Sequence, residues 1–253
     1  DIHPEATKIV VSINDLVFKL LKKIDSMTMR YSKSLITITD VMAREIKSRS
    51  MTQAPIHILN NPAVEFSDID ITKTKKLGFS FCGNVGRLQR IPLVLKAIET
   101  YFQRGGKLKF EFAGGGVYAD NLKSFSCKYS NFNYLGSVSP TEAAQVNANF
   151  SWALLPIEDE VTRFAFPSKS STYVFSGANI LAICGEQTGV AQWVKYNNLG
   201  IVIDPKVSSI VNTFFAIEKN TLKVSNFDKC RDHIKGEMSF EHFIKVLDDV
   251  VLG

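Results

Sequence analysis

The sequence predicts an α/β protein with a doubly wound parallel sheet and a partial second α/β domain. Three observations lead to this fold class. From residue 77 onward, short apolar runs alternate with amphipathic helical segments, glycine-rich turns follow several of the runs, and a less regular mixed segment precedes them. Apolar runs that alternate with helices form parallel strands, because a parallel connection needs a dozen or more residues, usually as a helix.

The composition supports a folded protein and limits its partners. Hydrophobic residues make up 45% of the 253 residues and include 18 phenylalanines, which is enough for a sizeable core. The net charge of +5 suits a diphosphate or an anionic membrane surface but is too small to indicate nucleic acid binding. No run approaches the about 18 apolar residues of a membrane-spanning helix.

Residues 1–66 contain the elements of the partial domain. Apolar side chains at three- and four-residue steps predict a helix over residues 7–29, and strands are expected at 34–39 and 55–59. Asp40 is expected to be the N-cap of a helix between these strands. The lysines near the middle of the first helix form either a solvated face or, as the alternative, a basic patch that faces a membrane: Lys19, Lys22 and Lys23.

A polar segment without apolar periodicity separates this part from the rest, and we predict the interdomain linker at residues 67–76. Six strands are then expected in the domain at 77–205, at residues 77–82, 108–113, 132–135, 152–156, 179–183 and 199–203. Helices are expected between them, at residues 92–103, 119–125, 140–149, 167–175 and 190–196. The 140–149 helix opens with a capping box at Ser139 and Glu142. Residues 206–253 are expected to add further helices.

Three turns in this domain carry groups that suit an anion. The first spans residues 83–90 and contains two arginines, the second is the glycine run 114–116, and the third spans 166–171, where Pro167 is expected to begin a helix. Ligands of open parallel sheets bind at the carboxyl ends of the strands, where helix N-termini and free N–H groups face them. Each segment alone could be a tight turn, but three at converging strand ends predict a phosphate-containing ligand.

Several other kinds of site lack support in the sequence. The four histidines and four cysteines show no metal-ligand spacing, and no Gly-x-Ser-x-Gly elbow occurs. The turn at residues 83–86 differs from Gly-x-Gly-x-x-Gly, and no acidic residue follows about twenty positions later at a strand end. A metal site, a serine hydrolase and a dinucleotide enzyme are therefore not expected.

The order of these segments resembles the retaining GT-B glycosyltransferases of the group 1 or family 4-like type, which build bacterial O-antigen and capsular polysaccharides. The resemblance covers residues 77–205, and the segments that carry it are residues 81–89, 112–116, 133–138, 166–182 and 200–203. Residues 1–5 and 36–42 resemble the late part of that family's N-terminal domain. We therefore expect this chain to be a fragment with the Rossmann-like C-terminal domain and the end of the acceptor-side domain.

The resemblance implies a nucleotide-diphosphate sugar, most simply a UDP-sugar, on residues 77–205 and a lipid-linked saccharide acceptor held mainly by the N-terminal domain. It also implies metal-independent transfer at the cytoplasmic face of the plasma membrane. The cations that would stabilise the departing diphosphate are Arg87, Arg90 and Lys169. The other donor-binding residues would be Gly83, Asn84, Gly86, Gln89, Gly114, Gly115, Ser168, Ser170 and Thr172, with the base near Tyr134, Leu135 and Gly136.

This sequence departs from the family pattern at two pairs of positions. Asn84 and Gln89 stand where many members have Arg and Lys, and Phe164 and Thr172 stand where many have Glu. Ribose recognition must then differ, and Glu158 and Glu160 either contribute to it or form a solvated acidic loop. Two alternatives stay open: a UDP-sugar 2-epimerase on the same two-domain plan, and a non-catalytic subunit that binds a nucleotide sugar.

Overall fold

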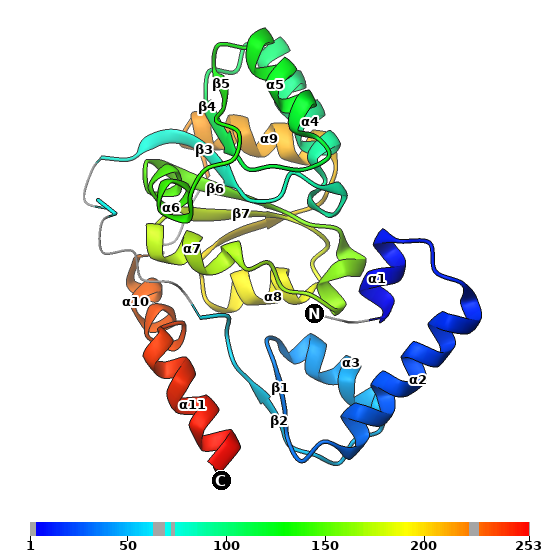
Figure 1. The fold of residues 1–253 in the computed structure, drawn as a ribbon. Coiled ribbons are helices and arrows are strands. Elements are labelled where there is room, and N and C mark those ends of the chain that lie inside the picture. Colours follow the sequence, from blue (N-terminus) through cyan, green and yellow to red (C-terminus); the bar gives the residue numbers. More distant parts are fainter. Residues whose placement is uncertain (1–3, 63–68, 72–73, 223–227, 253) are drawn as a thin grey trace.

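The computed structural model describes residues 4–62, 69–71, 74–222 and 228–252 (Figure 1). Its centre is a six-stranded sheet in the order β5-β4-β3-β6-β7-β8, in which all neighbouring strands are parallel. The strands are β3 (Lys76–Cys82), β4 (Lys109–Ala113), β5 (Phe132–Tyr134), β6 (Phe150–Pro156), β7 (Asn179–Ile183) and β8 (Gly200–Ile203). The chain reverses its direction across the sheet between β3 and β6, as in doubly wound folds. The predicted fold class is confirmed.

Helices cover both faces of the sheet. One face carries α4 (Ile91–Gln103), α5 (Ala119–Lys128) and α9 (Val207–Glu218), and its core is rich in aromatic side chains that contact one another, such as Phe79, Phe110 and Phe214. The other face carries the helices α6 (Pro140–Ala148), α7 (Lys169–Ser176), α8 (Gly189–Tyr196) and α10 (Asp228–Glu237). Burial of both faces explains why the central strands β6 and β7 are nearly continuous apolar runs.

The first part of the chain forms a smaller α/β unit. Strands β1 (Leu35–Thr37) and β2 (Ile56–Ile58) pair in parallel, with α3 (Asp40–Ser50) between them in the chain. The helix predicted over residues 7–29 is wrong as a single element, because α1 (Pro4–Val10) and α2 (Asp15–Tyr31) are separate. The side chain of Asn14 accepts a hydrogen bond from the N–H of Leu16 and caps α2, so a new helix begins there.

Two other helix starts differ from the prediction. Thr39, not Asp40, caps α3, because its hydroxyl accepts the N–H of Met42 at 3.2 Å. Helix α7 begins at Lys169 rather than at Pro167, whose carbonyl accepts the N–H of Ser170 in a turn that leads into the helix. The capping box at the start of α6 is confirmed.

The end of the chain is helical, as predicted. Helix α9 packs against α4 and closes the aromatic core, while α11 (Phe240–Leu252) extends away from the sheet (Figure 1). No helix among the described residues is both long and apolar enough to span a membrane. The domain boundaries at residues 66, 76 and 205 stay predictions.

Candidate functional site

A cavity of about 460 Å³ lies where the carboxyl ends of β3 and β4 meet the start of α7. Five of the predicted site residues line it: Gly83, Gly114, Ser168 and Lys169 from the three predicted turns, and Thr172 just after the third. Sequence reasoning missed other lining residues, among them Asn147 and Ser171. This is the edge of a doubly wound sheet at which ligands bind.

Two glycines let the first two turns pack directly against each other. Gly83 has φ +145° and Gly114 has φ +130°, which are values that L-residues rarely adopt. The N–H of Gly83 donates to the carbonyl of Ala113 at 3.0 Å, and the N–H of Gly114 donates to the carbonyl of Gly136 at 2.7 Å. A Cβ on Gly114 would overlap the carbonyl group of Gly83. Only glycine therefore fits at Gly114, and its bare backbone forms part of the cavity wall.

Lys169 brings to this cavity an amine that has no hydrogen bond to any described residue. Its Nζ lies 3.8 Å from the ring centroid of Phe81, is shielded from solvent, and has no hydrogen-bond partner among the described residues. Burial lowers the pKa of Lys169 to about 7, although the neighbouring Cys82 acts in the opposite direction. Burial also raises the pKa of the Cys82 thiol to about 12, so this thiol is neutral at physiological pH.

Asn147 supplies a second unpartnered donor. Its Oδ1 accepts the hydroxyl of Ser80 at 2.8 Å, whereas its Nδ2 is buried without a partner in the part of the chain that the structure describes. Buried polar groups are nearly always hydrogen-bonded in proteins. Two orphan donors that border one cavity, Nδ2 of Asn147 and Nζ of Lys169, therefore point to an acceptor-rich ligand such as a diphosphate.

The rest of the first turn supports the site without lining the cavity. A Cβ on Gly86 would come within 2.9 Å of Oε1 of Gln89 and 3.1 Å of the Asn84 side chain. Gly115 accepts the N–H of Val85 through its carbonyl at 2.9 Å. The absence of a side chain on Gly86 leaves room for Gln89 and Asn84, and the Val85–Gly115 hydrogen bond holds the first turn against the second.

The three predicted cations lie in different surroundings. The Arg87 side chain is exposed in the short 3-10 helix η1 (Arg87–Gln89). The guanidinium of Arg90 instead contacts Glu158, Asp159 and the carbonyl of Ile157. Only Lys169 among the three lines the cavity.

The predicted base-binding segment follows β5. The hydroxyl of Tyr134 donates to the carbonyl of Gly114 at 2.7 Å, and Gly136 has φ +73° with open space where a Cβ would be. Leu135 is exposed and lines a second hollow of about 450 Å³, which Val138 shares with the cavity. Ser170 is buried in α7 and lies outside the lining, so Ser171 takes the place expected for it.

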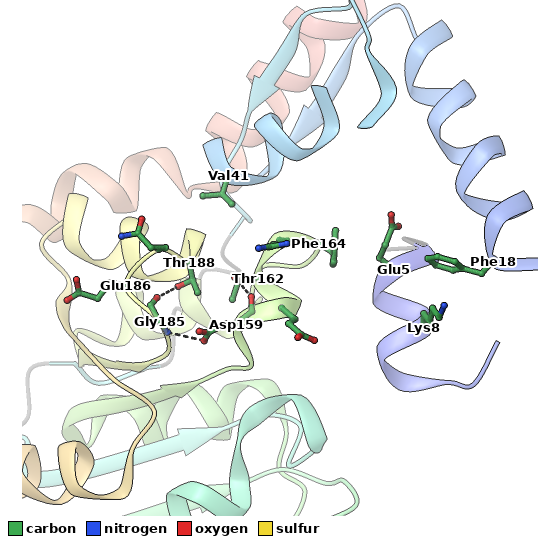
Figure 2. Close-up of a pocket in the computed structure, with 13 residues that line it drawn as sticks. Glu5, Lys8, Phe18, Val41, Asp159, Thr162, Phe164, Gly185, Glu186 and Thr188 are labelled. Atoms are coloured by element: carbon green, nitrogen blue, oxygen red, sulfur yellow. Dashed lines mark hydrogen bonds between the residues drawn. The ribbon is translucent and has the colours of Figure 1, made fainter. Parts of the chain in front are cut away.

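A larger cavity of about 850 Å³ lies between the two parts of the chain (Figure 2). One wall comes from the first two helices and carries Glu5, Lys8 and Phe18. The opposite wall comes from the loops that follow β6 and β7 and includes Asp159 and Thr188. The carboxyl edge of the sheet thus carries one cavity over β3 and β4 and another over β6 and β7.

Comparison with known proteins identifies the fold. No protein-family model matches the chain. It is 24% identical over 205 residues to the probable glycosyltransferase WbjE of Pseudomonas aeruginosa, and the alignment covers 76% of this chain and 50% of that protein. The structure of S. aureus TarM with fondaparinux, α-GlcNAc-glycerol and UDP is similar with a TM-score of 0.71 at 14% identity, over 95% of this chain and 48% of TarM. The chain has the GT-B glycosyltransferase fold.

A further solved structure of this fold is WaaG, a glycosyltransferase involved in lipopolysaccharide biosynthesis. It matches with a TM-score of 0.66 at 13% identity, over 98% of this chain and 72% of WaaG. The chain spans about half the length of the curated relative it matches. These similarities are consistent with the resemblance of the sequence to GT-B glycosyltransferases of bacterial polysaccharide synthesis.

Within the GT-B fold of this chain, the family's two Glu positions separate. Thr172 lines the smaller cavity beside Lys169, whereas Phe164 lines the larger one (Figure 2). Neither side chain carries a carboxylate.

Proposed function

We propose that this chain holds the nucleotide-diphosphate sugar of a glycosyltransferase, and that the whole protein transfers the sugar to a saccharide acceptor. The observation that carries this proposal is the cavity at the ends of β3 and β4, with the orphan donors of Lys169 and Asn147 beside glycine backbone. The relative WbjE is a probable glycosyltransferase, and TarM was solved with UDP, which favours a UDP-sugar as the donor.

In this proposal, side-chain cations and backbone N–H groups stabilise the leaving diphosphate. Lys169 and the first turn of α7 would stabilise the charge that develops on the departing diphosphate, with the exposed Arg87 of the turn after β3 as a further cation. The transfer would retain the anomeric configuration and need no metal, because these cations take the place of a divalent ion.

The acceptor would be a lipid-linked saccharide of bacterial surface polysaccharide, at the cytoplasmic face of the plasma membrane. WaaG, which shares the fold, is involved in lipopolysaccharide biosynthesis. The exposed apolar side chains of α2, such as Leu16 and Leu20, lie on the same helix as Lys19 and Lys23 and suit an anionic membrane surface.

The full-length protein incubated with radiolabelled UDP-sugars and a bacterial lipid extract tests the proposal. Transfer of label to the lipid fraction is expected. Conversion of UDP-GlcNAc into its 2-epimer without transfer would instead favour the epimerase alternative. Binding of UDP in calorimetry with neither reaction would favour the non-catalytic subunit, and the absence of UDP binding would contradict the proposed site.

Chelation tests the metal-independent mechanism. Activity of the full-length protein in EDTA is expected to stay within about twofold of its value without chelator, since charge stabilisation by fixed cations needs no metal. The described residues contain no cluster of three or more potential metal ligands. The Asp68-Ile69-Asp70 sequence lies in the predicted linker, and Asp68 is outside the described residues. A loss of activity that Mg²⁺ or Mn²⁺ restores would therefore direct attention to this segment.

The affinity for UDP is expected to fall as the pH rises from 7 to 9. Burial holds the pKa of Lys169 at about 7, and a diphosphate beside the ammonium would raise it. Below pH 7 the Lys169 amine is already protonated before UDP binds. Above pH 7 the amine takes up a proton when UDP binds, so the affinity for UDP falls by up to about tenfold for each pH unit. The terminal phosphate of UDP, with a second pKa near 6, stays ionised across this range.

Calorimetry in two buffers of different ionisation enthalpy measures this proton uptake directly. The neighbouring Cys82 and Tyr173 have raised pKa values and stay neutral in this range, so they add no titration. Lys169→Met should abolish the uptake. The same proton uptake in this variant would assign the titration to another group.

A further inference from the structure

We infer that Arg90 is a positioning residue that fixes the loops after β6 and β7, which form one wall of the larger cavity, against the turn after β3. This inference rests on the proposed function, because it concerns the side of the sheet on which the sugar and its acceptor would meet. It differs from the sequence-based expectation that Arg90 stabilises the diphosphate itself.

All three nitrogen atoms of the Arg90 guanidinium contact the loop after β6. Nε donates to the carbonyl of Ile157 at 2.7 Å, Nη1 lies 3.0 Å from Oε2 of Glu158, and Nη2 donates to Oδ1 of Asp159 at 2.9 Å. The side chain is only 15% exposed. These contacts engage all three guanidinium nitrogens with groups of one loop, and Arg90 does not line the cavity proposed to hold the diphosphate.

The backbone of Arg90 adopts a left-handed conformation, as expected for a residue held in place by its contacts. Its φ of 46° and ψ of 30° place it in the left-handed region, at the junction between η1 and the start of α4. The N–H of Glu158 donates to the carbonyl of Leu88 at 2.9 Å, so the turn after β3 and the loop after β6 also share a backbone contact. Non-glycine residues in this region are uncommon and cluster at functional sites, where surrounding contacts compensate for the strain.

Asp159 extends the connection to the next loop. The oxygen Oδ1 that accepts from Arg90 also accepts the N–H of Gly185 at 2.9 Å, and the hydroxyl of Thr162 donates to the Asp159 carbonyl at 2.7 Å (Figure 2). A Cβ on Gly185 would overlap the Asp159 carboxylate. One guanidinium therefore holds the loops after β6 and β7 together through a single carboxylate.

The charge arrangement explains why an arginine is needed here. Three acidic residues follow one another at positions 158–160, and their mutual repulsion would open the loop without a cation between the first two. A lysine has three donors on a single nitrogen, so it cannot reproduce contacts that leave from the three separate nitrogens of the planar guanidinium. Asp159, Thr162 and Gly185 all line the larger cavity, whereas Arg90 does not, so Arg90 acts through them.

The test compares Arg90→Lys and Arg90→Gln with Arg104→Gln in the full-length protein. Arg104 lies just after the opposite end of α4, where its exposed side chain contacts the ring of Phe215. Both Arg90 variants should keep UDP affinity within about twofold of wild type, because the donor cavity is untouched. Amide exchange should become faster in residues 157–165 and 184–188, and transfer efficiency should fall about ten- to hundred-fold through misplacement of the cavity wall. Arg104→Gln should change none of these.

The outcomes separate the inference from the function on which it rests. Unchanged amide exchange in both loops of the Arg90 variants would overturn the inference. A loss of UDP affinity while both loops stay protected from exchange would also overturn it, and would indicate that Arg90 binds the diphosphate. If the wild-type protein binds no UDP and transfers no sugar, the proposed function fails, yet the exchange measurement still decides whether Arg90 holds the loops. Asp159→Asn should speed exchange in the same residues, and the double variant with Arg90→Gln should add little to it.

Discussion

Replacing Lys169 by alanine in the full-length protein is expected to lower both the affinity for UDP and the catalytic efficiency about ten- to hundred-fold. The physical reason is a charge-assisted contact worth roughly 1.5–3 kcal/mol between the ammonium and the diphosphate. The ammonium lies over the Phe81 ring without a hydrogen bond to any described residue, so a diphosphate would supply a partner for it. Calorimetry with UDP and steady-state kinetics measure the two effects.

Two further variants at this position separate charge from packing. Lys169→Met keeps most of the aliphatic stem over Phe81 and removes the charge, so it should lose UDP affinity like the alanine variant while the thermal midpoint stays equal or rises. Lys169→Arg should recover only part of the affinity, because a planar guanidinium does not fit the space of a compact ammonium. Wild-type affinity in the methionine variant would remove Lys169 from the donor site.

The fold could be predicted because its signals are local. Strands β6 and β7 are apolar runs, glycine-rich turns follow β3 and β4, and the Ser139–Glu142 capping box marks a helix start within four residues. The errors in the fold have equally local causes. Asn14 interrupts an apolar periodicity that otherwise continues from α1 into α2, and Thr39 caps α3 in competition with the neighbouring Asp40.

The candidate site could be predicted only in part. The turns that contain Gly83, Gly114 and Lys169 are brought together by parallel topology, which the alternation of elements already implies. Asn147 was missed because it is a polar residue on the buried face of α6, and nothing nearby in the sequence connects it to a ligand. The signal that could have revealed it is its position between the apolar residues Val146 and Ala148, since a polar side chain buried there needs a partner.

The partners of Arg90 could not be predicted from the sequence. Its carboxylate contact with Asp159 joins residues 69 positions apart, on turns after β3 and β6. Topology places these turns at neighbouring strand ends, but the choice of Arg90 over Arg87 depends on the left-handed backbone at Arg90. That conformation has no sequence signature at a non-glycine residue.

Gly114→Ala is expected to destabilise the protein by roughly 2–4 kcal/mol, which combines the strain of an L-residue at φ +130° with overlap between its Cβ and the Gly83 carbonyl. For a chain of this size the thermal midpoint should fall by roughly 5–15 °C. UDP affinity should fall as well, because the turn after β4 can relieve the overlap only by moving away from Gly83 and widening the cavity between them. Differential scanning calorimetry and titration with UDP below the new midpoint measure these effects.

Two other glycines separate the causes of this loss. Gly136 shares a positive φ, at +73°, but has open space at its Cβ position, so Gly136→Ala should cost only the conformational part, about 1–2 kcal/mol. Gly236 lies in α10 with neither constraint, and Gly236→Ala should raise stability by about 0.5–1 kcal/mol. If Gly114→Ala lowers the free energy of unfolding no more than Gly136→Ala does, the backbone of the second turn does not pack against Gly83 in the way described above. The donor cavity would then have to be built from other groups, because the Gly83–Gly114 contact is what brings the two turns to one wall.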